Sequence, residues 1–279
     1  MRRLLWVVPA LLVGWFALTE AIEPRWLVWL GGILNPGPTP LSMDLGNGLA
    51  VQAYKDTRPH GGKVMTVQKG LVLVQDGDEL VEEGYGFGAP ILIYQGQQYL
   101  SQHAEVEQSP DRRQIVKRFQ MDTIDTWTEF LRPKYRPTPS LGTVVFTYTV
   151  ASPGVLEVAA DFTGLRVEPE LAYLSNEQGA IPFTLYSDSA GDQRYFADYV
   201  DQWQPASAPR TCFTAEKRRV RFCVETEPGQ AKYVGRERYI QYRWAGVFWL
   251  SWAGTDIELT RPRGVYRYRV VTEVLQWAE

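Results

Sequence analysis

Two histidines, His60 and His103, are the only imidazole groups in this chain of 279 residues. His60 lies in the loop-like stretch 58–62, and His103 follows a strand-like segment. An imidazole beside a carboxylate could serve as a general acid and base. Nothing in the spacing brings either histidine to a carboxylate, so isolated turn or surface histidines are the simpler interpretation.

Carboxylates are the other catalytic candidates, because a facing pair of them can cleave a glycosidic bond. Asp122 with Asp125 and Asp198 with Asp201 are such candidates. Three-residue spacing on a strand sends two side chains to opposite faces, which disfavours both pairs. Residues 188–192 could offer oxygen ligands to calcium, but they lack the rest of a calcium loop and predict a turn instead.

Motifs for other chemistries are missing from the sequence. It contains no Gly-x-Ser-x-Gly elbow, no phosphate-binding Gly-x-x-x-x-Gly-Lys string and no His-Glu-x-x-His zinc helix. The formal net charge of −3 lacks the basic excess that collects phosphates. The sequence therefore favours a non-catalytic protein with no cofactor, no metal and no nucleic-acid partner.

Aromatic residues and arginine are concentrated in residues 238–252, which read RYIQYRWAGVFWLSW. Trp and Tyr stack on the apolar faces of sugar rings, while Arg and Gln hydrogen-bond hydroxyl groups. The predicted ligand-binding residues are Trp203, Tyr239, Tyr242, Arg243, Trp244 and Trp249, with Tyr266 and Tyr268 as an extension. An alternative stays open, in which one face of these strands is core and the other packs on a second sheet.

Cys212 and Cys223 are the only cysteines. A hairpin centred on residues 216–219 would place Cys212 opposite Cys223 and Phe213 opposite Phe222. Direct cross-strand neighbours are close enough for a disulfide, so we predict one, with two buried thiols as the alternative.

Short β-type runs separated by Gly, Pro and Asp turns fill the chain from Leu45 onward. The alternation of strands and helices that a parallel α/β fold needs is absent. We therefore predict an all-β fold, a large antiparallel β-sandwich with room for one short helix. At fold level the pattern is similar to the large sandwiches of sugar mutarotases and carbohydrate-active enzymes, but no motif identifies a family.

One hairpin can be registered from the sequence, with strands at residues 143–150 and 155–162. Only a loop of odd length separates the apolar face from the polar face, because side chains alternate with a period of two. A three-residue loop, Ser152-Pro153-Gly154, satisfies this rule and puts Gly154 in a left-handed position.

The segment 109–131 has two interpretations. Ser109-Pro110-Asp111 is a good helix start, and several apolar residues share a helical face. The residues Ile115, Lys117, Phe119 and Met121 also alternate as a strand would, and both alternatives stay open.

The N-terminus has the pattern of a signal peptide or signal anchor. Arg2 and Arg3 precede an uncharged run, residues 4–19, and Glu20 and Glu23 follow it. This charge order predicts a body outside the cytoplasm, in the periplasm or the extracellular space. We predict an uncleaved transmembrane helix (1–23), an interfacial segment with a Pro-rich linker (24–44) and a β-sandwich domain (45–279), with cleavage as the open alternative.

Together these features predict a single-pass membrane protein that contacts the lipid bilayer through residues 1–34. Its preferred function is binding or scaffolding of a carbohydrate of the cell envelope. One alternative is an accessory subunit that docks its anchor on a membrane-protein partner. Another is a sugar-modifying enzyme, mutarotase-like or glycosidase-like, that uses His60 or His103 with a carboxylate.

Overall fold

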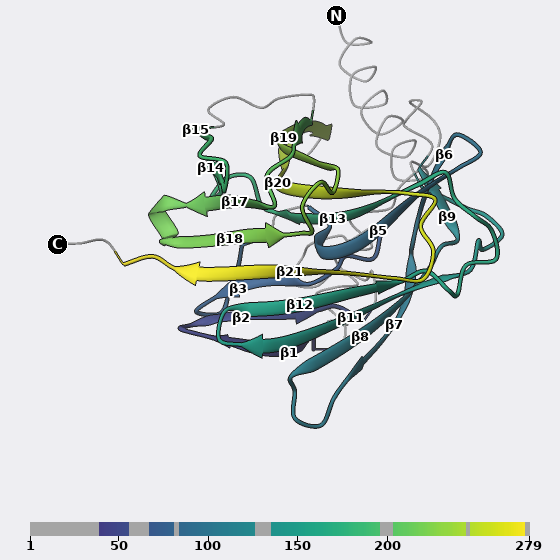
Figure 1. Cartoon of the computed structure of the whole chain (residues 1–279), viewed down its shortest axis with the longest axis horizontal. Coiled ribbons are helices and arrows are strands. Elements are labelled where there is room, and N and C mark those ends of the chain that lie inside the picture. Colours follow the sequence, from purple (N-terminus) through teal and green to yellow (C-terminus); the bar gives the residue numbers. More distant parts are fainter. Residues whose placement is uncertain are drawn as a thin grey trace, which may run out of the picture.

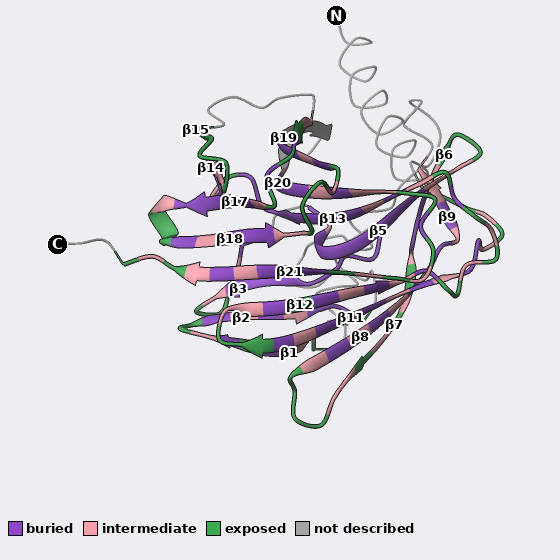
Figure 2. Cartoon of the chain, in the orientation of Figure 1, coloured by how far each residue is buried: buried purple, intermediate pink, exposed green. Residues whose placement is uncertain are grey.

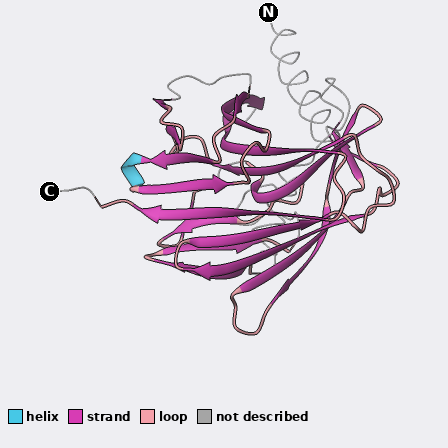
Figure 3. Cartoon of the chain, viewed as in Figure 1, coloured by secondary structure: helices cyan, strands magenta, loops and turns pink. Residues whose placement is uncertain are grey.

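The computed structural model describes residues 39–55, 67–80, 84–125, 135–195, 203–243 and 246–276, without the side chains of residues 135 and 237–251. Within these ranges the chain is built of antiparallel strands and one short 3-10 helix, Glu216–Arg218 (Figures 1 and 3). The all-β prediction is confirmed. None of the helical structure in these ranges has the length and hydropathy of a bilayer span. The predicted anchor and interfacial segment lie outside the described residues.

The strands form three sheets. In spatial order, the small sheet contains β1 (Leu41–Gly46), β2 (Leu49–Ala53), β3 (Val72–Gln75) and β4 (Asp78–Glu79). The eight-stranded sheet contains β10 (Tyr135–Pro137), β9 (Thr123–Asp125), β6 (Gln97–Leu100), β5 (Gly86–Tyr94), β13 (Leu171–Gln178), β20 (Gly246–Thr260), β19 (Lys232–Arg243) and β16 (Gln204–Ala206). The nine-stranded sheet contains β15 (Gln193–Tyr195), β14 (Leu185–Asp188), β17 (Arg210–Ala215), β18 (Val220–Glu225), β21 (Val265–Val274), β12 (Val155–Asp161), β11 (Thr143–Ser152), β8 (Gln114–Gln120) and β7 (His103–Gln108).

One hydrophobic core contains side chains from all three sheets. Along β11 and β12 buried residues alternate with less buried ones, as the banding in Figure 2 shows. Two buried tyrosines also hydrogen-bond across the layers: Tyr148 of β11 donates to Gly88 O at 2.6 Å, and Tyr268 of β21 donates to Asn176 Oδ1 at 3.0 Å. The nine-stranded sheet is therefore one layer of a sandwich, and its partner layer consists of the other two sheets.

The two sheets of that partner layer meet at a seam. Backbone contact across it consists of an isolated bridge between Leu71 and Phe87, together with hydrogen bonds from Gly70 N to Tyr85 O (2.6 Å) and from Gly179 N to Leu80 O (2.9 Å). The buried side chain of Gln178 adds two hydrogen bonds: it accepts from Leu73 N at 3.1 Å and donates to Leu71 O at 3.4 Å. An amide side chain thus takes the place of ladder bonds at this point.

Gly88 permits the close approach of β5 to β11. A Cβ at this position would lie 2.8 Å from Tyr148 Cε1 and 2.9 Å from Phe146 Cδ1, and the residue has a φ of +74°. Both the space and the backbone conformation therefore require glycine here.

The hairpin registered from the sequence is confirmed. Phe146 pairs with Ala160, Tyr148 with Val158 and Val150 with Leu156, and all six side chains are buried. The strands continue to a Ser152–Val155 pair, with a bulge between Val150 and Ser152 that keeps the two faces separate. Gly154 has a φ of +74°, as predicted.

The segment 109–131 is β-structure wherever it is described. Residues 109–113 form the turn between β7 and β8, and β8 buries Ile115, Lys117 and Phe119 completely. Tertiary burial of this face outweighed the helix-start signal at Ser109. Residues 126–131 lie outside the described part.

Lys117 is an unusual residue for this core. Its Nζ donates to Tyr54 O at 3.1 Å and to Lys69 O at 2.6 Å. Desolvation by burial lowers the pKa of Lys117 to about 7. The ammonium group thus holds the chain at the end of β2 and the approach to β3 through two carbonyl groups.

Candidate functional site

The predicted ligand-binding residues belong mainly to the long hairpin β19–β20. In its register Tyr239 pairs with Leu250, Tyr242 with Val247 and Arg243 with Gly246, while Trp249 pairs with Ile240. The side chains of these four predicted residues lie outside the description, and so does Trp244. Their role in binding stays a prediction.

Trp203, the remaining predicted residue, lies just before β16 and is half-buried. A Cβ on Gly235 would lie 2.7 Å from its Cδ2 and 3.0 Å from its Cε2. The indole of Trp203 therefore packs flat against the backbone of β19 at Gly235, where the missing side chain leaves room for the ring. Because Val234 points into the core, Gly235 and the indole are on the outer face of the eight-stranded sheet.

Two tyrosines and two carboxylates belong to the same outer face as Trp203. Tyr173 of β13 pairs directly with Glu258 of β20, and Tyr233 of β19 pairs directly with Asp256 of β20. All four are half-buried. We call these four residues together with Trp203 the tyrosine–carboxylate face.

The rings of this face meet over β20. Tyr173 and Tyr233 come from the strands on either side of β20, and their ring centroids are 6.4 Å apart with an interplanar angle of 70°. Asp256 and Glu258, two residues apart on one strand, have backbones about 6.7 Å apart. Aromatic rings and carboxylates thus lie side by side on this face, and Asp256 Oδ1 is buried there.

Tyr173 connects the two kinds of group. Its hydroxyl donates to Glu258 Oε2 at 3.0 Å. Desolvation, followed by this hydrogen bond and the nearby negative charges, raises the pKa of Tyr173 to about 12. The phenol therefore stays protonated at neutral pH and orients the Glu258 carboxylate.

Apolar and polar groups adjoin the tyrosine–carboxylate face. The ring of Tyr173 packs against a small cluster of Val67, Ile91 and Leu100. Beside it, Ser175 pairs in register with Asp256 and is fully buried. The Ser175 hydroxyl has no hydrogen-bond partner among the residues described.

Tyr266 and Tyr268 do not extend this surface, so that prediction is wrong. Both belong to β21 of the opposite layer and take part in the core, with Tyr268 only 4% exposed. They occupy the inward positions of the strand alternation, which the sequence alone did not resolve.

His103 does have a carboxylate partner. Its Nδ1 lies 2.9 Å from Asp122 Oδ2, but the histidine side chain is 72% exposed. Asp122 also accepts a hydrogen bond from the Thr123 hydroxyl at 3.1 Å. The imidazole of this pair is thus largely open to solvent. His60, Asp198 and Asp201 lie outside the described residues.

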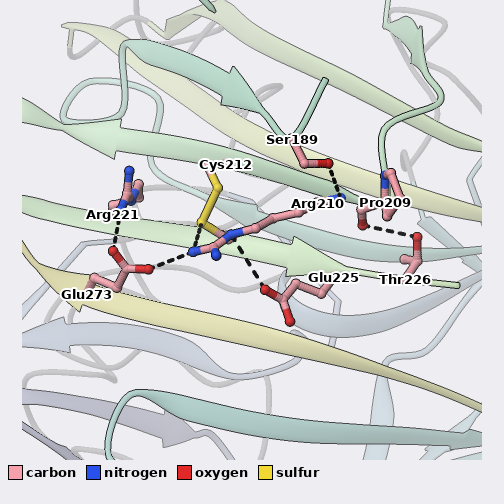
Figure 4. A network of polar contacts seen from close by, with 9 residues as sticks. Ser189, Pro209, Arg210, Cys212, Arg221, Glu225, Thr226 and Glu273 are labelled. Atoms are coloured by element: carbon pink, nitrogen blue, oxygen red, sulfur yellow. Dashed lines mark hydrogen bonds and ion pairs between the residues drawn. A yellow bond between two sulfur atoms is a disulfide. The ribbon is translucent and has the colours of Figure 1, made fainter. Parts of the chain in front are cut away.

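The disulfide between Cys212 and Cys223 is confirmed, as is the register that places Phe213 opposite Phe222. Arg210 covers it: the guanidinium Nη2 lies 3.3 Å from Cys223 Sγ and 2.6 Å from Glu273 Oε1 (Figure 4). Hydrogen bonds from Arg221 and Arg210 hold the pKa of the Glu273 carboxyl below its usual value despite desolvation. The contacts link β17, β18 and β21, with the Arg210–Glu273 pair reaching across β18, so this network stabilises the sheet.

The acidic stretch 188–192 is the predicted turn. Asp188 Oδ1 accepts from Ala190 N at 2.9 Å and from Asp192 N at 3.1 Å. No group of three potential metal ligands occurs in the part of the chain that the structure describes.

The sequence analysis missed Tyr173, Tyr233, Asp256 and Glu258. The spacing of the two acidic residues within one strand was a usable signal, because a two-residue spacing puts both on one face. Tyr173 is 83 residues from Asp256 in the chain, and only the pairing of β13 with β20 brings it there.

No known protein family and no curated protein matches the sequence. Among solved structures, the chain is similar to 4-alpha-glucanotransferase from Thermococcus litoralis (TM-score 0.48, 7% identity, 86% of this chain and 38% of that one). It is also similar to heparan sulfate lyase HepC from Pedobacter heparinus (0.47, 10%, 95% and 42%) and to a putative aldose 1-epimerase from Escherichia coli K12 (0.43, 10%, 85% and 99%). The chain thus spans about two fifths of the first two proteins and nearly all of the third. These neighbours are sugar-related, and the likeness is one of fold.

Proposed function

We propose that the protein is a membrane-anchored, extracytoplasmic β-sandwich that binds carbohydrate through the tyrosine–carboxylate face. The observation that carries the proposal is the pair of cross-strand contacts Tyr173–Glu258 and Tyr233–Asp256, side by side on one sheet face. The N-terminal charge pattern and the disulfide support a location outside the cytoplasm.

The chemistry of this face suits a sugar ring. Pyranose rings have apolar C–H faces that stack on Tyr and Trp, and Tyr233 and Trp203 supply such rings without long flexible side chains. Carboxylate oxygens accept hydrogen bonds from sugar hydroxyls, and charge-assisted bonds are the stronger kind. Tyr173 holds Glu258 in place, which lowers the ordering cost of binding.

The two carboxylates also select the ligand. Asp256 and Glu258 would repel a uronate or a sulfated sugar at this distance and would accept hydrogen bonds from a neutral or an amino sugar. We therefore propose neutral or amino sugars as the ligand class. Tyr239 and Arg243, which the sequence predicts as ligand-binding residues, belong to the same strand, β19, as Tyr233, and the proposal includes them.

A glycan array followed by titration calorimetry tests the proposal. The array contains neutral, amino and acidic oligosaccharides, and we expect binding to the first two classes. Tyr233→Ala should then weaken binding of the best ligand about tenfold, because one stacked aromatic ring contributes about 1.4 kcal/mol.

Tyr195→Ala is the matched control. Tyr195 is an exposed tyrosine of β15, in the opposite layer, and it also hydrogen-bonds a glutamate, Glu216, at 2.9 Å. The Tyr195→Ala variant should bind the best ligand with unchanged affinity. Equal effects of the two variants, or a preference for acidic glycans that Glu258→Gln does not alter, would refute the proposal.

A further inference from the structure

Two loops at one end of the sandwich form an open pocket of about 250 Å³. One loop, residues 162–170, connects β12 to β13, and the other, residues 261–264, connects β20 to β21 (the yellow loop of Figure 1). Both loops cross from one layer to the other. Backbone hydrogen bonds from Phe162 N to Gly264 O (2.9 Å) and from Arg261 N to Glu170 O (3.0 Å) fasten them together.

Buried apolar residues and exposed charged residues both line the pocket. Phe162 and Pro262 are the buried ones, and the exposed side chains of Arg166, Glu168 and Arg263 form its charged rim. A small organic molecule with an apolar or ring-shaped body therefore fits this space.

The rim has more positive than negative charge. Arg263 Nη2 forms an ion pair with Glu168 Oε2, and this pair bridges the two loops. The guanidinium of Arg166 makes no hydrogen bond or ion pair with the residues that the structure describes. Its backbone is nevertheless anchored, because Arg166 N donates to Leu141 O at 2.8 Å.

We propose that this rim pocket binds a small organic carboxylate. The planar guanidinium of Arg166 would hold the carboxylate through two parallel hydrogen bonds, and Arg263 would add a second cation. Phe162 and Pro262 contact the body of the ligand. The carboxylate has two sources, a sugar acid or an aromatic acid, and the inference does not depend on the proposed glycan site.

Glu168 has a specific part in this site. Its carboxylate competes with the ligand for Arg263 and repels an incoming anion. Glu168→Gln should therefore tighten binding about fivefold, the effect of removing one negative charge a few ångströms from an anion near the surface. A gain of affinity cannot result from damaged folding.

The experiment is a ligand-detected NMR titration of the full-length protein in lipid nanodiscs. The probes are D-glucuronate and benzoate, with D-glucose and benzyl alcohol as their neutral counterparts. We expect one or both anions to bind and the neutral compounds to bind at least tenfold more weakly. Tighter binding of glucuronate identifies a sugar acid as the ligand, and tighter binding of benzoate identifies an aromatic acid.

The chain offers a matched control pair. Arg269 and Glu157 form an ion pair at 3.2 Å that is about as exposed, but it lies in the middle of β21 and β12. Five residues of strand separate it from the pocket, about 17 Å, which exceeds the screening length at 0.1 M salt. Glu157→Gln and Arg269→Met should therefore leave binding unchanged, while Arg166→Met should weaken it about tenfold.

Three results would overturn the inference. The first is the failure of both anions to bind the wild-type protein. The second is equal affinity of the Glu168→Gln and Glu157→Gln variants. The third is equal affinity of the Arg166→Met and Arg269→Met variants, with folding of each confirmed by circular dichroism.

Discussion

The buried ammonium group of Lys117 should make the stability of the protein depend on pH. Its pKa is about 7 in the folded protein, against 10.5 for a lysine in water. Between these two values the unfolded chain binds more protons than the folded one, so the free energy of unfolding rises as the pH increases. Below about pH 7 the folded protein is destabilised by the full free energy of the pKa shift, and above about pH 10.5 this destabilisation is absent.

The magnitude follows from the two pKa values. Proton linkage over the interval from pH 7 to pH 9 gives a rise of about 2 kcal/mol in the free energy of unfolding from this one group. The Lys117→Met substitution removes this pH dependence, because methionine carries no charge, and its similar length lets it fill the same space. The variant also loses the hydrogen bonds to Tyr54 O and Lys69 O, which adds an offset that does not depend on pH.

Urea unfolding followed by tryptophan fluorescence at pH 7, 8 and 9 measures the effect. We expect the difference in unfolding free energy between wild type and Lys117→Met to change by about 2 kcal/mol across this range. Lys217→Met, at an exposed lysine of the 3-10 helix, should follow the wild type at every pH. A constant difference between wild type and Lys117→Met from pH 7 to pH 9 would refute the reasoning.

Three further predictions concern the disulfide, the layer contact and the N-terminus. Replacing both Cys212 and Cys223 with serine should lower the free energy of unfolding by about 3 kcal/mol, and addition of a reductant should then have no effect on the variant's urea midpoint. Gly88→Ala should lower the free energy of unfolding by about 2 kcal/mol or more, because its Cβ would lie against the rings of Tyr148 and Phe146. Gly96→Ala, with open space around it and a similar φ of +68°, should lower it only by the backbone strain. The urea midpoints of the two variants measure the difference. Deletion of residues 1–23 should move the protein from the carbonate-washed membrane fraction to the soluble fraction, and an immunoblot that still finds it in the membrane would contradict the predicted anchor.

Local sequence signals predicted the parts of this fold that are close along the chain. The register of the hairpin around Ser152-Pro153-Gly154 followed from alternation and from a glycine in a left-handed position. The disulfide followed from the symmetry of the sequence around residues 216–219. In both cases the pairing partners belong to one hairpin, as with Cys212 and Cys223, which are 11 residues apart, so few alternative registers compete.

Features that depend on distant pairing could not be predicted in this way. Tyr173 reaches Glu258 because β13 pairs with β20, and no local pattern specifies that neighbour. Tyr268 was placed on the wrong face because alternation gives two faces without saying which is inner. The alternation around Lys117 indicates a strand but not that the lysine is buried. Its burial depends on the carbonyl groups of Tyr54 and Lys69, which come from two other segments.

The seam at Leu71 and Phe87 interrupts the backbone ladder within one layer of the sandwich. A continuous ladder would make the four strands from β1 to β4 open and close together with the rest of the layer. Here the Leu73 amide depends for its protection from exchange on the single side chain of Gln178. The small sheet is therefore the unit expected to exchange its amide protons with solvent before the remainder of its layer.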